Sequence, residues 1–136
     1  MIVLDTHVWY RWVTPADPLP APIQSLIARA DAVVVSAISI WEIARLAQRG
    51  RIDLKRDIRV WLPIALSGAH IGCLPITEPI ALRAALLPEI HRDPADRLII
   101  STAIETASNL ISFDAVFPNY AELQELLIGD IAPKPC

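Results

Sequence analysis

The chain has 136 residues, which suits one domain with one core, so we expect a single domain over residues 1–136. Hydrophobic residues make up 54% of it, and this surplus suggests that apolar surface is covered by a partner or by a second copy of the chain. The net charge of −3 argues by itself against tight nucleic-acid binding, and two cysteines, Cys73 and Cys136, exclude a disulfide framework and a cysteine metal site.

Apolar runs and helical patterns alternate through the first fifty residues. The run MIVL (1–4) predicts a strand buried on both faces, and a short helix follows near residues 8–13. Helically spaced apolar residues predict a second helix over 22–30, and the β-branched run AVVVS (32–36) predicts a second strand. The segment ISIWEIARLAQRG (38–50) predicts a helix that stops at its final glycine.

The middle of the chain holds a stretch without Asp, Glu, Lys or Arg, from Val60 to Thr77, whose length approaches that of a membrane span. Prolines and glycines interrupt it, so we predict a helix over 56–66 and a buried strand over 71–76, with Cys73 as a core thiol. The opening MIVLDTH lacks the basic flank of a signal peptide. We therefore expect a cytoplasmic protein.

The last part of the chain continues the alternation. A helix is predicted from residue 77 or 78 to about 87, and HRDPAD (91–96) opens another that runs to about 107. NLISF (109–113) predicts a fourth strand, followed by a helical turn and a final piece around 120–128. Continuous apolar strands that alternate with helices are typical of an α/β fold, with a parallel sheet covered on both faces. Ligands bind such sheets beyond the carboxyl ends of the strands.

Four acidic residues, Asp5, Glu42, Asp96 and Asp114, border or interrupt the apolar runs. Two follow predicted strands and two lie in the first turns of predicted helices, so all four can reach the same end of the sheet. Carboxylates are rarely buried unless they are paired or bind a cation. If the fold gathers the four, they form an oxygen-rich site for Mg²⁺ or Mn²⁺, suited to phosphodiester hydrolysis.

Each acid also has a simpler interpretation. Asp5 and Asp114 can cap a helix or a turn, and in DPAD (93–96) both acids suit a helix start. Glu42 has no polar face around it, and an arginine such as Arg45 or Arg97 can neutralise it.

Three polar residues stand next to these acids in the sequence. Thr6 and Ser112 can share the site of the neighbouring aspartates. His7 has no histidine or cysteine at metal-ligand spacing, so we interpret it as structural.

A basic stretch lies between Arg45 and Arg59, where six cations and two anions give a local charge of +4. Cations beside an acidic site suit a metal-dependent nuclease, because they hold phosphates. The candidate RNA contacts are Arg45, Arg49, Arg51 and, beside Asp96, Arg97. The simpler interpretation of this stretch is a solvated helix end and turn.

The combined pattern resembles that of PIN-domain ribonucleases, and within them the VapC toxins of bacterial toxin–antitoxin modules. The resemblance rests on LDTHVWYRWV, VSAISIWEIARLAQRGRIDL, HRDPADRLIISTA and SFD, and covers essentially the whole chain. Two positions depart from the usual pattern. Ala95 stands where a larger apolar residue is common, and Phe113 where many relatives carry a polar or basic residue, which puts the seating of RNA in doubt.

The resemblance implies a PIN-like three-layer α/β/α fold with about four to five parallel strands. It implies a catalytic and metal-binding quartet of Asp5, Glu42, Asp96 and Asp114 that holds one or two Mg²⁺ or Mn²⁺ ions and cleaves RNA. Asp93, Thr6 and Ser112 match supporting positions, with Asp93 a cap or an outer ligand.

The resemblance also implies partners: a cognate antitoxin, a second copy in a homodimer, and a heterotetramer or larger complex in a bacterial cytoplasm. Of the four tryptophans, we expect Trp41 and Trp61 in the core.

Two alternatives remain within the family: an RNA-processing nuclease without toxicity, and a non-catalytic binding module. A phosphatase with an aspartate nucleophile is discounted, because it needs a second Asp where this chain has His7.

Overall fold

The computed structural model describes residues 1–129, so Cys136 lies outside the described residues. Five strands form one parallel sheet in the order β3-β2-β1-β4-β5. The strands are short, and their bounds are β1 Ile2–Leu4, β2 Val33–Ser36, β3 Ile71–Leu74, β4 Asn109–Ile111 and β5 Leu127–Ile128. The predicted α/β fold with a parallel sheet is confirmed.

Within residues 1–129, six α-helices and three 3₁₀ turns accompany the strands. The helices are α1 Thr6–Val13, α2 Ala21–Arg29, α3 Ala37–Gln48, α4 Ile58–Ala65, α5 Glu78–Leu86 and α6 Pro94–Glu105, and the 3₁₀ turns are η1 Ser67–Ala69, η2 Phe117–Asn119 and η3 Ala121–Leu123. Five of the helices begin at a polar residue whose side chain accepts a hydrogen bond from the first turn: Asp5, Ser36, Asp57, Thr77 and Asp93.

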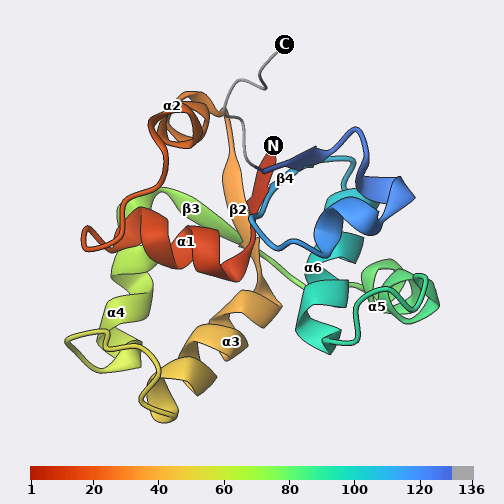
Figure 1. Ribbon diagram of the computed structural model, residues 1–136. Coiled ribbons are helices and arrows are strands. Elements are labelled where there is room, and N and C mark those ends of the chain that lie inside the picture. The colour runs from red at the N-terminus through yellow and green to blue at the C-terminus, as the bar shows by residue number, and fades with distance from the viewer. Residues whose placement is uncertain (130–136) are drawn as a thin grey trace.

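Helices cover both faces of the sheet, as Figure 1 shows, with α1, α2 and α4 on one side and α5 and α6 on the other. On the first side, Trp9 packs against Trp61 with ring centroids 5.3 Å apart, and its indole N–H donates to the carbonyl of Ala65. On the second side, Ile99 of α6 packs with Phe117 and Tyr120, all fully buried. The PIN-like three-layer arrangement is thus present.

The strand register brings the ends of β1 and β4 together. Leu4 pairs with Ile111, and the backbone N–H of Asp5 donates to the carbonyl of Ile111 at 3.0 Å. The residues that follow, Asp5 and Ser112, therefore leave the sheet side by side. The loop and helix that follow each strand carry the polar groups described below.

The structure corrects two predictions about apolar residues. Strand β3 is an edge strand, and its Gly72 and Cys73 are exposed, so neither the buried strand nor the core thiol is correct. Trp41 is 57% exposed on α3, whereas Trp61 is buried as predicted. In residues 1–129, none of the helices combines the length and apolar composition needed to cross a membrane.

Candidate metal and active site

Asp5 lies at the end of β1 and caps α1. Its Oδ1 accepts from the backbone N–H of Thr6 at 2.8 Å, and its Oδ2 accepts from the hydroxyl of Ser112 at 2.6 Å. The Nδ1 of His7 lies 3.3 Å from the same Oδ2, while the Nε2 of His7 accepts from the backbone N–H of Phe113. The carboxylate is 2% exposed and is held on every side by donors.

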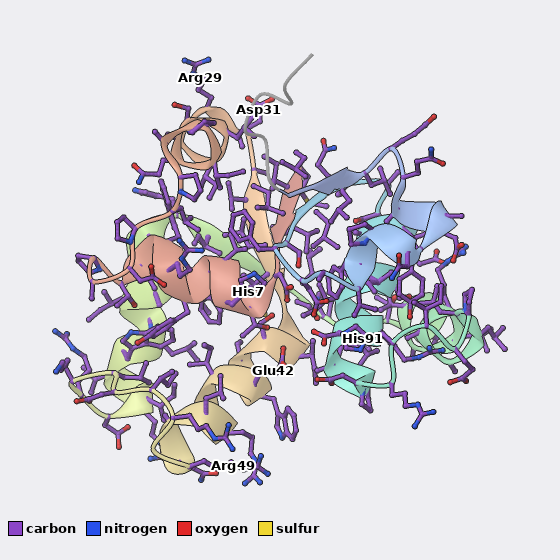
Figure 2. All side chains as sticks on the ribbon, in the orientation of Figure 1. His7, Arg29, Asp31, Glu42, Arg49 and His91 are labelled. Carbon is purple, nitrogen blue, oxygen red and sulfur yellow. The ribbon has the colours of Figure 1, made fainter. Side chains whose placement is uncertain are left out.

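Glu42 reaches the same place from the second turn of α3. Its Oε1 accepts from the hydroxyl of Thr6 at 2.5 Å, and that hydroxyl also hydrogen-bonds Ser39 at 2.8 Å. Thr6 therefore ties Glu42 to the start of α1, beside Asp5. Figure 2 shows Glu42 on α3, with its side chain on the side of the helix that faces α1 and α6.

Asp93 and Asp96 open α6. The side chain of Asp93 accepts from the N–H of Ala95 at 2.9 Å, so it caps the helix as its sequence predicts. Asp96, one turn on, has a side chain that is only 15% exposed. Carboxylate oxygens of Asp93, Asp96 and Glu42 lie within 4.8 Å of one another.

Asp114 follows β4, and Ser112 links it to Asp5. The hydroxyl of Ser112 donates to Asp5 and accepts from the backbone N–H of Asp114 at 3.1 Å. The Oδ1 of Asp114 accepts from the N–H of Val116 at 2.8 Å, which leaves Oδ2 facing the other acids. All four predicted acids, and both predicted hydroxyl residues, thus meet at the carboxyl end of the sheet.

The four acids and Thr6 line one cavity of about 230 Å³. One wall is acidic and the other apolar, from Tyr10, Ile43, Leu46 and Ile52. A larger apolar hollow lies elsewhere, between α5 and η3. Its charged residues are Arg83, Glu105 and Glu122, and Arg83 pairs with Glu105. The four carboxylates gathered in the acidic cavity therefore make that cavity the stronger candidate site.

The carboxylates raise one another's proton affinity. Burial, followed by the negative charges of Asp5, Asp93, Glu42 and Asp114, raises the pKa of Asp96 to about 8. Burial also raises the pKa of Asp5 and of Glu42. Hydrogen bonds from Ser112 and Thr6 to Asp5, and from Thr6 to Glu42, act in the opposite direction and lower these pKa values. A cluster of buried oxygen ligands that cannot all be ionised without a counter-charge fits a hard divalent cation.

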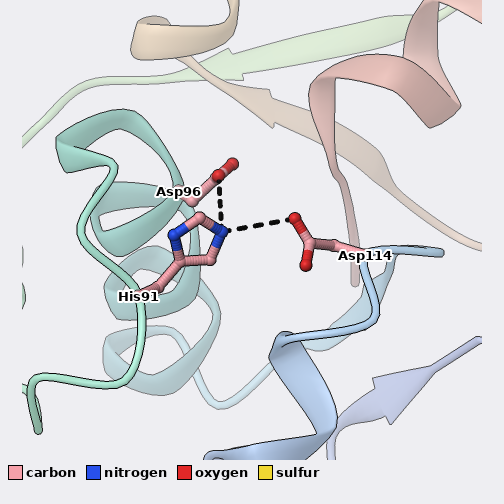
Figure 3. A group of neighbouring side chains, drawn as sticks. All are labelled: His91, Asp96 and Asp114. Atoms are coloured by element: carbon pink, nitrogen blue, oxygen red, sulfur yellow. Dashed lines mark hydrogen bonds and ion pairs between the residues drawn. The ribbon is translucent and has the colours of Figure 1, made fainter.

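His91 belongs to this cluster, and the sequence analysis missed it. Figure 3 shows its Nε2 between Asp96 and Asp114, at 2.9 and 3.3 Å from their Oδ2 atoms. It was treated only as part of the loop that opens α6. The available signal was its position two residues before a capping aspartate, on the segment that presents Asp96.

The structure corrects the prediction for Arg97. Its guanidinium faces the interior and is 8% exposed, so it is unavailable for RNA and does not pair with Glu42. It donates to five backbone carbonyls, two in the last turn of α5 and three in the loop that leads to α6: those of Ala84, Ala85, Leu87, Pro88 and His91.

The other candidate RNA contacts lie toward the end of α3. Arg49 and Arg51 are exposed there, and Arg45 is half-buried beside Gln48. Arg49 lies seven positions after Glu42, which corresponds to roughly 10 Å along a helix. Figure 2 shows Arg49 at the outer end of α3, on the same side of the molecule as Glu42.

Comparison with known proteins shows what this chain is similar to. The family model of the PIN domain matches residues 2–123. Ribonuclease VapC22 of Mycobacterium tuberculosis is 38% identical over 114 residues, which are 83% of this chain and 86% of the relative. The chain also resembles solved structures at low identity.

The crystal structure of VapBC2 from Rickettsia felis bound to a promoter DNA fragment aligns with a TM-score of 0.70 and 19% identity, over 95% of this chain and 98% of that one. A toxin–antitoxin complex from Klebsiella pneumoniae aligns with a TM-score of 0.66 and 20% identity, over 94% of this chain and 96% of that one.

Proposed function

Because this chain belongs to the PIN-domain family, we propose that it is a metal-dependent endoribonuclease, the toxin of a bacterial toxin–antitoxin pair. The observation that carries the proposal is the meeting of Asp5, Glu42, Asp96 and Asp114 around one cavity. The 38% identity to a VapC ribonuclease supports RNA as the substrate and the cytoplasm of a bacterium as its setting.

The four acids are proposed to hold one or two Mg²⁺ or Mn²⁺ ions. A divalent cation bound there supplies a Lewis acid that activates water and stabilises charge on the scissile phosphate. The chain's own polar groups fix the carboxylates beforehand. Ser112 and the N–H of Thr6 hold Asp5, the hydroxyl of Thr6 holds Glu42, and Asp93 is an outer acid that caps α6.

Metal binding should stabilise the protein more at pH 8 than at pH 6. The pKa of Asp96 is raised from 3.8 to about 8, so the metal-free folded state binds this proton more tightly than the unfolded chain. The resulting stability is fully present below about pH 4 and is lost as the pH rises to about 8. A cation that pairs with the ionised carboxylate restores this stability. The affinity of the protein for the cation should rise about tenfold for each unit by which the pH increases toward 8.

Thermal unfolding with and without Mn²⁺, at pH 6 and pH 8, measures this effect. The expected result is a larger rise in melting temperature at pH 8, and Ca²⁺-free buffer with added Na⁺ at equal ionic strength is the control. Equal shifts at both pH values would argue against Asp96 as a ligand, and no shift at either would argue against a metal site.

Reversing two charges at the end of α3 should weaken RNA binding. Arg49 and Arg51 are exposed, and neither carries a carboxylate ion pair within the described residues. If both contact phosphates, Arg49→Glu with Arg51→Glu should lower the slope of log K against log salt by about 1.4. Fluorescence anisotropy of a labelled single-stranded RNA over a salt series measures it. Arg29→Glu, on α2 and far from α3 in Figure 2, is the matched control. An unchanged salt slope would mean that the stretch with Arg49 and Arg51 is a solvated helix end that does not contact RNA.

Exposed apolar side chains support a protein partner. Trp41 on α3, Val60 and Ile64 on α4, and Leu82 and Leu86 on α5 are each more than half exposed. Such surface suits a cognate antitoxin, a second copy in a homodimer, and a heterotetramer or larger complex formed by both. Trp41 directly precedes Glu42, so a partner that covers Trp41 would bind to the helix that carries this acid.

Two alternatives keep the same fold. An RNA-processing nuclease without toxicity would cleave RNA but would have no antitoxin gene beside it. A non-catalytic module would bind RNA or protein and would cleave nothing with any metal. The presence of all four acids in one cavity favours catalysis, because a binding module gains nothing from a cluster of carboxylates that repel one another.

A further inference from the structure

The ring of His91 is placed between two of the acids by contacts at both of its nitrogens. Nε2 lies 2.9 Å from Asp96 and 3.3 Å from Asp114, and Nδ1 faces the backbone N–H of Asp93 at 3.3 Å. The side chain is 17% exposed, and its ring packs edge-on against Phe117 with centroids 5.9 Å apart. Both polar ends of the imidazole are therefore engaged.

These contacts decide which nitrogen carries the proton. The N–H of Asp93 is a donor, so Nδ1 must accept. A neutral imidazole that accepts at Nδ1 carries its hydrogen on Nε2, and that hydrogen points at Asp96 and Asp114. His91 therefore donates to two carboxylates rather than offering them a lone pair. Direct ligation of a cation by Nε2 would move the hydrogen to Nδ1, where it would meet the N–H of Asp93.

The backbone of His91 is fixed on both sides. Its N–H donates to the hydroxyl of Tyr120 at 2.8 Å, and its carbonyl accepts from Nη1 of Arg97 at 3.1 Å. Tyr120 is fully buried, and Arg97 is buried as well. The backbone of His91 is therefore fixed beside the acids, and the contacts of its two ring nitrogens hold the ring itself.

We propose that His91 is a positioning residue for the metal site. Its Nε2–H links Asp96 on α6 to Asp114 after β4, and so holds carboxylates from two separate elements at the spacing that a cation needs. The proposal rests on the proposed metal-dependent function. It assigns His91 a role outside the ligand set, in which the hydrogen bond orients the ligands and leaves their other lone pairs free.

The first test compares Mn²⁺ binding to the wild-type protein, His91→Ala and His91→Gln. Losing a hydrogen-bond partner of metal ligands typically lowers affinity 10- to 100-fold, so His91→Ala should bind Mn²⁺ that much more weakly by paramagnetic resonance titration. Glutamine places an amide N–H near the position of Nε2–H, so His91→Gln should regain most of the affinity. His70→Asn is the control, because His70 is exposed and has a positive φ of 58° that Asn tolerates.

Equal Mn²⁺ affinity in His91→Ala and the wild type would overturn the proposal. Tighter binding in His91→Ala would overturn it as well, because it would show that His91 competes with the ion. If the wild type itself binds no Mn²⁺, the proposed function fails instead, so the two failures are distinguishable. Circular dichroism and melting temperature of each variant exclude unfolding as the cause of a loss.

The second test reads the tautomer directly. Long-range ¹⁵N–¹H spectra of the three histidines should show His91 with its hydrogen on Nε2, both before and after addition of diamagnetic Mg²⁺. Retention of Nε2–H with Mg²⁺ bound supports the donor role. A move of the hydrogen to Nδ1 when Mg²⁺ binds would mean that Nε2 is a ligand, and would overturn the proposal even if affinity had fallen in His91→Ala.

Discussion

Replacing Asp5 by asparagine is expected to abolish RNA cleavage while leaving the fold intact. The side chain keeps its size, and its carbonyl oxygen can still accept from the N–H of Thr6, so the cap of α1 survives. The substitution removes one negative charge from the centre of the cluster. If that charge contributes several kcal/mol to holding the cation and the transition state, the rate falls by about a thousandfold.

The same substitution should change the stability of the metal-free protein only modestly, because two contributions oppose each other. An amide –NH2 in place of Oδ2 loses the hydrogen bond from Ser112 and the contact with Nδ1 of His7, which destabilises the fold. Burial raises the pKa of Asp5, so its ionised form is unfavourable in the folded state, and a neutral amide removes that cost at pH 8. Cleavage of a fluorogenic RNA and a melting curve, measured together, separate the two effects. Asp31→Asn, at an exposed position, is the matched control. Native-rate cleavage by the Asp5→Asn protein would refute the assignment.

Among substitutions of a single charged residue, Arg97→Lys is expected to cause the largest loss of stability. The guanidinium donates to five carbonyls of one segment, and the three donors of an ammonium cannot match that fork. Buried carbonyls left without donors cost about 3 kcal/mol in total, which corresponds to a melting temperature lower by roughly 10 °C. Because the charge is kept, the loss measures hydrogen-bond geometry.

Chemical denaturation of Arg97→Lys, with exposed Arg29→Lys as the control, measures that loss. The segment that Arg97 holds also carries His91, so Mn²⁺ affinity should fall together with stability. A midpoint unchanged from the wild type would mean that the five contacts contribute little, and would remove the support that they give to the position of His91.

The sheet and the acids could be predicted because their signals are local. Strands β1 and β2 are short runs rich in β-branched residues, and a charge at the end of such a run, as at Asp5, is conspicuous. Their parallel arrangement follows from the intervening helices. The order of the strands does not, because it depends on which connections cross the sheet. For that reason β3 was predicted to be buried, although it lies at an edge and exposes Cys73.

The missed parts of the site depend on contacts between distant segments. His91 and Asp114 are 23 residues apart, and only the fold brings them together. Arg97 stands beside Asp96 in the sequence, which suggested a surface cation, yet its side chain turns inward to carbonyls of the preceding loop. Trp41 is expected in the core, whereas the structure leaves it 57% exposed on α3.

Cleavage of purified single-stranded RNA by the intact protein, with Mn²⁺ and with excess chelator, tests the central claim most directly. The account predicts cleavage at internal phosphodiester bonds with Mn²⁺, no cleavage with chelator, and restoration when Mn²⁺ is added back. The Asp5→Asn protein prepared in parallel should be inactive in all three conditions. Cleavage that persists in chelator, or equal cleavage by the Asp5→Asn protein, would contradict a metal-dependent site built on these four acids.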